Sequence, residues 1–221
     1  MSELRSALLL SLQVASIATL LIALTAIPLA FFFARSRFRG KSLLEALLTV
    51  PLVLPPTVVG YFLIVLFGRN GWIGQFTFRW FGYSILFRRE GAVLAAAVVS
   101  LPLLFLPAKA AFAAIERELE DIARLYGANP LQIFWHVSLP LARRGIVSGL
   151  FLAFARALGE FGATTMVLGD REGQRTLPIS IYMDYISGNP TAATVAAVLL
   201  LTGISLAITY AYNRSPLGGR S

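Results

Sequence analysis

The sequence contains no cysteine and a single histidine, and these two shortages exclude several kinds of chemistry. Without cysteine the chain can form no disulfide bond, no thiolate metal site and no cysteine nucleophile. One histidine cannot supply a histidine-based metal cluster. We therefore predict no metal ion, no cofactor and no catalytic residue.

Charged residues are also scarce, at 14% of the 221 residues, whereas 57% are hydrophobic and the mean hydropathy is +0.74. A soluble domain carries about 25% charged residues, so much of this surface must face lipid. The charges that remain sum to +8. Such an excess is typical of proteins next to nucleic acid or a membrane surface, and the positions of the cations decide between the two.

Five apolar blocks are each long enough to cross a hydrocarbon core about 30 Å thick, which takes about 20 helical residues. The first block is longer than the core of a signal peptide and is followed by a basic loop, so we expect a retained helix. The sequence predicts an all-α integral membrane protein with one domain, residues 1–221, and about five spans. The predicted spans are residues 7–33, 43–67, 92–115, 145–168 and 192–212.

The lysines and arginines predict the orientation, because cytoplasmic loops of membrane proteins are enriched in these residues. Eleven fall on one side of the predicted membrane and seven on the other, with Arg156 inside a span. We therefore expect the N-terminus outside, the C-terminus in the cytoplasm and no nucleic-acid partner. The eleven are Arg35, Arg37, Arg39, Lys41, Lys109, Arg117, Arg124, Arg143, Arg144, Arg214 and Arg220.

The outer loop 68–91 mixes aromatic residues with arginines, a composition that suits the headgroup region. It is either a short interfacial helix or a docking surface for an external partner. The second outer loop, residues 169–191, can also meet such a partner.

Residues 116–140 are too polar to span and too regularly patterned for a linker. Apolar residues at helical spacing predict an amphipathic helix that ends at Gly127. Asn129 and Pro130 fit the cap and first position of a second helix, which we expect to end at Leu139–Pro140. A short helix with this much apolar surface should be buried against something.

The stretch from Asp121 to Pro140 resembles the EAA motif of binding-protein-dependent ABC importer permeases. That motif is E-A-A, three residues, Gly, nine residues and I-x-L-P. Four positions match outright, and Asp121, Ile122 and Val137 replace Glu, Ala and Ile. The matching residues are Ala123, Gly127, Leu139 and Pro140.

The resemblance implies a type I (MetI-like) permease fold in which this segment is the coupling helix that lies in a groove of the cytoplasmic ATPase. It also implies two ATPase copies, a second permease copy and a periplasmic or lipid-anchored binding protein as partners. A helix-turn-helix packed on its own bundle is the structural alternative. The implied coupling residues are Asp121, Ala123, Gly127, Asn129, Pro130, Leu131, Phe134, Trp135, Leu139 and Pro140.

Three further stretches, residues 51–61, 155–164 and 175–178, resemble the molybdate permeases of this family and, at a greater distance, the sulfate permeases. The resemblance covers essentially the whole chain. It implies an oxyanion as cargo, either molybdate or tungstate, with sulfate as the alternative. Discrimination among these anions is expected to lie largely in the binding protein.

Arg156 and Glu160 stand four residues apart in the predicted fourth span. An isolated charge at that depth costs at least about 2.5 kcal/mol, so we expect the two to pair with each other or with a neighbouring subunit. The pair either fixes helix packing or lines and gates the path. Gly162 and Gly159 bracket Glu160 and predict a close helix approach there.

Prolines in the second span remove backbone donors and predict irregular backbone at membrane depth, which is tolerated only where it is buried in protein or faces a water-filled cavity. Residues 55–60 are therefore pathway candidates, with a simple kink as the alternative. Weak neutral hydroxyls suit a path that must release its cargo. The candidates in this part of the chain are Pro55, Pro56, Thr57, Gly60 and Ser100.

Two other classes of protein fit less well. A membrane enzyme has no support, because His136 lies in the predicted coupling element and no Ser-His-Asp grouping is available. A P-loop is also absent, since the Gly required ahead of Lys41 and Ser42 falls at Arg35. A self-sufficient channel or secondary transporter would leave the helix pair at 109–144 unexplained.

Overall fold

The computed structural model describes residues 2–169, 175–188 and 190–214, and every regular element in these ranges is a helix. This confirms the predicted all-α fold. Arg171 and Arg220, which entered the orientation count, lie outside the described residues.

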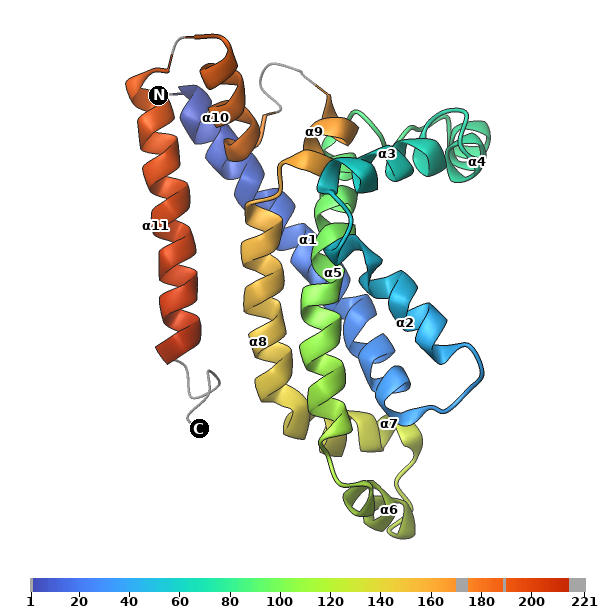
Figure 1. Cartoon of the computed structure of the whole chain (residues 1–221). Coiled ribbons are helices and arrows are strands. Elements are labelled where there is room, and N and C mark those ends of the chain that lie inside the picture. The colour runs from blue at the N-terminus through green and yellow to red at the C-terminus, as the bar shows by residue number, and fades with distance from the viewer. Residues whose placement is uncertain (1, 170–174, 189, 215–221) are drawn as a thin grey trace.

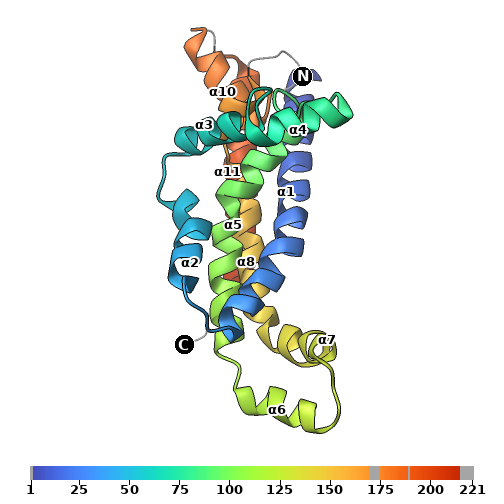
Figure 2. The same ribbon diagram turned by 90° about the vertical axis from the view of Figure 1, so that its right-hand side faces the viewer.

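Three long helices, α1 (Ser2–Arg35), α5 (Arg89–Ala113) and α8 (Leu139–Leu158), lie side by side and form the core of the bundle (Figures 1 and 2). A Cβ atom at Gly149 of α8 would lie 2.8 Å from a methyl carbon of Leu104 in α5, so this glycine sets the distance between the two helices. Small side chains do the same along α1. The fully buried alanines of that helix are Ala15, Ala18, Ala26 and Ala30.

The other elements are shorter, apart from a last long helix that stands to one side of the core in Figure 1. They are α2 (Lys41–Thr49), η1 (Val50–Leu52), α3 (Pro56–Phe67), α4 (Trp72–Phe81), α6 (Arg117–Leu125), α7 (Pro130–Ile133), η2 (Phe134–Ser138), α9 (Gly162–Leu168), α10 (Leu177–Ile186) and α11 (Ala192–Arg214).

The second predicted span is broken rather than continuous. Its two parts, Lys41–Leu52 and Pro56–Phe67, meet at an angle of 114°, and α3 lies across the end of the bundle in Figure 2. The break falls where Pro55 and Pro56 follow each other and remove two backbone donors. By length and composition, the described residues contain four spanning helices, or five if this bent pair counts as one span.

The fourth span is shifted relative to the prediction of 145–168. It runs without a break from Pro130 to Leu158, because η2 is a π-helix that joins α7 directly to α8. The expectation that Leu139–Pro140 ends the second cytoplasmic helix was therefore wrong. Pro140 is the second residue of α8 and follows the π-helix directly, so its missing N–H falls where the hydrogen-bonding pattern of the continuous helix changes.

The bundle has two distinct ends. α6 and α7 lie at one end, below the connection between α1 and α2, and α4 and α10 lie at the other (Figure 1). We call these the α6 end and the α4 end. α1 begins at the α4 end and α11 finishes toward the α6 end, so the chain crosses the bundle an odd number of times.

Candidate functional site: the α6 end and the α3–α9 contact

The turn between α6 and α7 has the local geometry that its residues predict. Gly127 has a φ of +82°, a left-handed conformation that glycine adopts without strain. Asn129 then caps α7, since its Oδ1 accepts from the N–H of Gln132 at 2.8 Å. The Gln132 Oε1 accepts in return from the N–H of Asn129 at 2.8 Å. This capping box, followed by Pro130 at the first position, fixes the start of α7.

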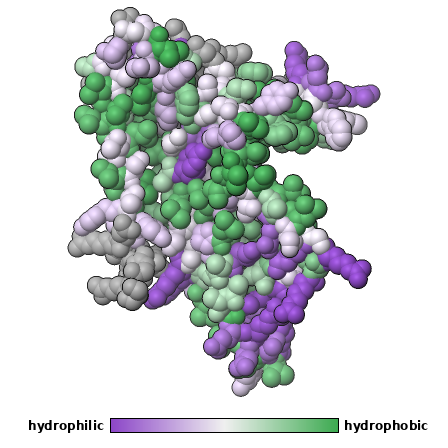
Figure 3. Space-filling view, in the orientation of Figure 1, coloured by the Kyte–Doolittle hydropathy of each residue, from purple (hydrophilic) through white to green (hydrophobic). Residues whose placement is uncertain are grey.

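Large apolar side chains are exposed on this end of the bundle, although charged residues surround them. Figure 3 shows hydrophilic side chains gathered over the α6 end, whereas the face above it is largely hydrophobic. The exposed fractions of six large apolar side chains at this end range from 43% to 89%, which is unusual for so many such residues in one place. We call this set the apolar patch: Leu119, Ile122, Leu125, Tyr126, Leu131 and Trp135.

Other predicted coupling residues face inward. The Phe134 ring packs edge-on against Phe31 of α1, with 5.1 Å between ring centroids, and lies 6.2 Å from the ring of Phe112 in α5. Leu139 also packs against the core. These two side chains are partly buried and join η2 and the start of α8 to the rest of the bundle. Trp135, by contrast, is 55% exposed.

A buried carboxylate joins α6 and η2 to the end of α1, and sequence reasoning did not find it. Glu120 of α6 is 3% exposed and accepts from the hydroxyl of Ser138 at 2.8 Å and from Nε of Arg35 at 2.9 Å. Arg35 is the last residue of α1 and also donates to the carbonyl of Ile115 at 3.2 Å. Three segments therefore meet at one carboxylate. The acidic run of the sequence does not indicate which of its members turns inward.

The acid of the EAA-like motif itself lies on the surface. Asp121 is 62% exposed and forms an ion pair with Arg124 one turn further along α6. Its neighbour Glu120 thus has the structural role, and Asp121 remains available to a partner.

The pathway candidates on α3 and α9 come together at a close contact. A Cβ atom at Gly60 would lie 2.7 Å from the Cβ of Met166 and 3.0 Å from the Cα of Ala163. A Cβ atom at Gly162 would lie 3.0 Å from the Cβ of Pro56. Both glycines are therefore required for α3 to cross α9 at this distance. Pro55 and Thr57, at the start of α3, are exposed.

Arg156 and Glu160 form the predicted pair, with 2.6 Å between Nη1 and Oε2. Glu160 does not lie in a continuous span, however, because α8 ends at Leu158. Its second oxygen, Oε1, accepts from the N–H of Ala163 at 2.8 Å and so caps α9. The Glu160 side chain is 1% exposed and that of Arg156 is 31% exposed, so the cation alone reaches the surface.

Ser100, the other predicted pathway hydroxyl, is fully buried in the middle of α5. It faces no open surface in this structure, because α5 is the central helix of the core and packs on both α1 and α8. Its hydroxyl has no hydrogen-bond partner among the described residues, and its place along the path stays a prediction.

The described residues thus form a helical bundle with membrane-spanning helices, a short helical segment at the α6 end and one broken span. Residues 26–215 match the family described as binding-protein-dependent transport system inner membrane component, and the chain belongs to this family. It is therefore a multi-pass protein of the inner membrane.

Curated relatives resemble the chain over most of its length. It is 44% identical to the molybdenum transport system permease protein ModB of Escherichia coli K12, over 91% of this chain and 88% of the relative. Identity to the ModB protein of Mycobacterium tuberculosis is 42%, over 97% and 81%. The sulfate transport system permease protein CysW of Synechocystis is 37% identical, over 82% and 69%.

Two solved structures share the fold. A chain of the inward-facing MetNI methionine ABC transporter superposes with a TM-score of 0.72 at 19% identity, covering 97% of this chain and 94% of that chain. A chain of a bacterial alginate ABC transporter in complex with its periplasmic protein gives 0.75 at 16% identity, covering 96% and 78%. The fold is thus that of the MetI-like importer permeases, as predicted.

Proposed function

We propose that this chain is the membrane subunit of an ATP-driven importer and that its cargo is molybdate. The observation that supports molybdate as the cargo is the 44% identity to a molybdenum transport permease over nine-tenths of the chain. The sulfate permease is less similar and is matched over a smaller part of the chain. Tungstate shares the charge and tetrahedral shape of molybdate, so it is the second candidate.

The apolar patch supports the proposal that a separate ATPase binds the α6 end. Leu125 and Tyr126 are 87% and 89% exposed, and a patch of such large apolar side chains is typical of a surface that binds another protein. The chain itself has no P-loop, so the energy comes from another polypeptide. We assign one ATPase copy to each of two permease copies.

A second permease copy is proposed because the helices of one chain enclose little space. In such a homodimer the path would run between the copies, past the α3–α9 contact and Arg156. The broken backbone at Pro55 supports this position, since irregular backbone at membrane depth must be buried or face a water-filled cavity. The α4 end would then face the periplasm, where a binding protein delivers the oxyanion, and the C-terminus would lie in the cytoplasm.

The contacts at the α6 end suggest how ATP hydrolysis would move the path. Phe134 packs on α1 and α5, and Glu120 joins α6 to the end of α1. We call residues 117–138, from α6 to η2, the docking element; it is continuous with α8 through η2. Closure of the two ATPase copies would therefore displace the docking element and the core helices together, as a rigid-body change that opens the other side of the path.

The coupling assignment is tested in lipid with the cognate ATPase and binding protein. Trp135→Asp, and likewise Gly127→Asp, should lower binding-protein-stimulated ATP hydrolysis at least about tenfold, because a charge in a desolvated interface centre costs more than 1.4 kcal/mol. Trp72→Asp is the control for the substitution itself, since Trp72 is 89% exposed at the α4 end, and it should leave binding of the ATPase to the chain unchanged. Unchanged hydrolysis in both docking variants would remove the coupling role.

A further inference from the structure

A groove of about 820 Å³ runs along the surface between α1 and α5, on a part of the bundle that the proposed transport function does not use. Its walls come from α1, from the upper half of α5 and from residues around α4. Apolar side chains make up most of the lining, among them Ile17, Leu21, Ile22, Val93, Leu94 and Leu101. A hollow of this size at membrane depth does not stay empty, because unfilled apolar walls lose their packing contacts.

The polar residues of the groove gather at one end of it. Gln13, Arg89 and Glu90 lie at the α4 end, and Thr25 marks the opposite limit. The Thr25 hydroxyl already donates to the carbonyl of Leu21 at 3.0 Å, so the inner part offers no free donor. From Gln13 to Thr25 the groove is about 18 Å long at 1.5 Å per helical residue. One leaflet contributes about 15 Å of hydrocarbon, so the groove has the depth of one leaflet.

The charged groups at the mouth are free to bind a ligand. Among the residues that the structure describes, the side chains of Arg89, Glu90 and Gln13 have no hydrogen-bond or ion-pair partner. The neighbouring Arg88 lies over the ring of Tyr83, 4.7 Å from its centroid. Arg89 and Glu90 are consecutive, and both lie in the first turn of α5. A cation and an anion side by side complement a headgroup that carries both signs.

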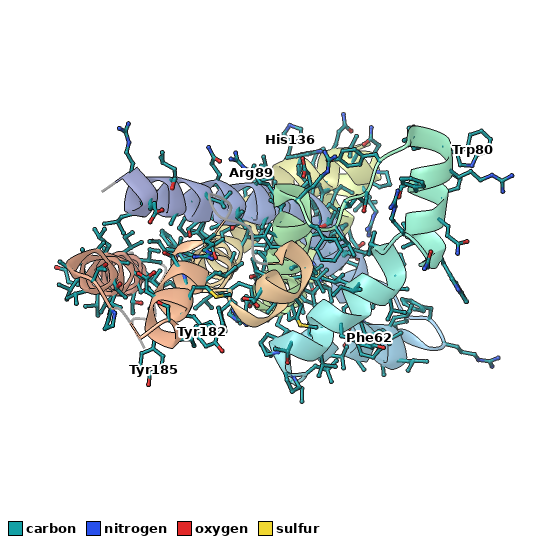
Figure 4. The ribbon with its side chains drawn as sticks, turned by 90° about the horizontal axis from the view of Figure 1, so that it is seen from above. Phe62, Trp80, Arg89, His136, Tyr182 and Tyr185 are labelled. Atoms are coloured by element: carbon teal, nitrogen blue, oxygen red, sulfur yellow. The ribbon has the colours of Figure 1, made fainter. Side chains whose placement is uncertain are left out.

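The walls of the groove favour a lipid chain over a transmembrane helix. Helices in membranes approach each other through small residues, whereas this groove is lined mainly by branched aliphatic side chains. Figure 4 shows Arg89 on the opposite side of the bundle from Phe62, Tyr182 and Tyr185. The mouth of the groove at Arg89 therefore lies away from Phe62 of α3 and from α10, although Phe67 at the end of α3 contributes to the lining.

We propose that this groove binds one phospholipid with a zwitterionic, primary-amine headgroup, of the phosphatidylethanolamine type. An acyl chain fills the hollow between α1 and α5. The phosphate accepts hydrogen bonds from Arg89 and Gln13, and the ammonium group donates to Glu90. Phosphatidylglycerol offers the same phosphate to Arg89 but has no ammonium group, so it would leave the Glu90 carboxylate without a partner.

Native mass spectrometry of the detergent-purified chain, delipidated and then supplied with either dioleoyl phosphatidylethanolamine or dioleoyl phosphatidylglycerol, tests the headgroup. The wild type should retain one phosphatidylethanolamine per copy in preference to phosphatidylglycerol. Arg89→Gln should reduce its retention about tenfold, as expected for one charge-assisted hydrogen bond. Glu90→Gln should abolish the preference between the two lipids. Arg79→Gln, which changes an exposed arginine of α4 outside the groove, should change neither.

A second pair of variants tests the hollow itself. Leu21→Trp should fill the groove and prevent lipid retention, whereas Leu24→Trp, which changes an exposed leucine of the same helix outside the lining, should leave it intact. Equal retention by both variants would overturn the proposal. So would a wild-type chain that retains neither lipid while Leu21→Trp alone alters the number of copies in the particle, because a second copy would then occupy the groove.

Discussion

Glu120 and Asp121 are adjacent carboxylates with opposite surroundings. Glu120 is buried between Arg35 and Ser138, whereas Asp121 lies in solvent beside Arg124. Exposed ion pairs contribute little to stability, typically about 0–1 kcal/mol. Removing one partner of a buried pair is more costly, because it leaves an uncompensated charge in a poorly solvated place. We therefore expect Glu120 to contribute to the stability of the fold and Asp121 to contribute little.

Glu120→Ala should lower the free energy of unfolding by about 3 kcal/mol, since it leaves the guanidinium of Arg35 without its carboxylate. Asp121→Ala is the matched control and should change stability by no more than about 0.5 kcal/mol. Chemical unfolding in mixed micelles measures both. Equal losses for the two variants would show that Glu120 does not join α1 to α6.

At the scale of elements, the crossing of α3 over α9 depends on Gly60. Gly60→Ala should cost about 1–3 kcal/mol, because its Cβ must displace the backbone of Ala163 or the side chain of Met166. Gly203→Ala in α11 is the control, since a Cβ there meets nothing within 4 Å and alanine favours the helix. The same unfolding assay compares them. If Gly60→Ala were as stable as Gly203→Ala, the close contact would not exist.

Much of this arrangement could be predicted from the sequence where local chemistry decides it. The prolines before α3 predict irregular backbone, and Gly127 and Asn129 predict the turn and cap at the α6 end. The start of the fourth span could not be predicted, because Pro140 is compatible with either a helix end or a first turn. The inward turn of Glu120 also depends on Arg35, 85 residues away, and no local pattern reports such a contact.

At the scale of the whole molecule, the start of α1, the end of α11 and the docking element all bear on how the chain is oriented in the membrane. α1 begins at the α4 end, while α6, α7 and the end of α11 lie at the opposite end. The basic loop between α1 and α2 lies at that opposite end as well, as expected for a cytoplasmic side. If an ATPase binds the apolar patch, as we propose, the α6 end is cytoplasmic and we expect an outside N-terminus.

The most direct test of this account is transport by the complete assembly. The chain is reconstituted in proteoliposomes with its ATPase and its binding protein, and uptake of molybdate, tungstate and sulfate is measured with and without ATP. We predict molybdate uptake that requires both ATP and the binding protein, with sulfate transported poorly. Oxyanion flux through the chain alone, independent of ATP, would contradict the account and indicate a channel.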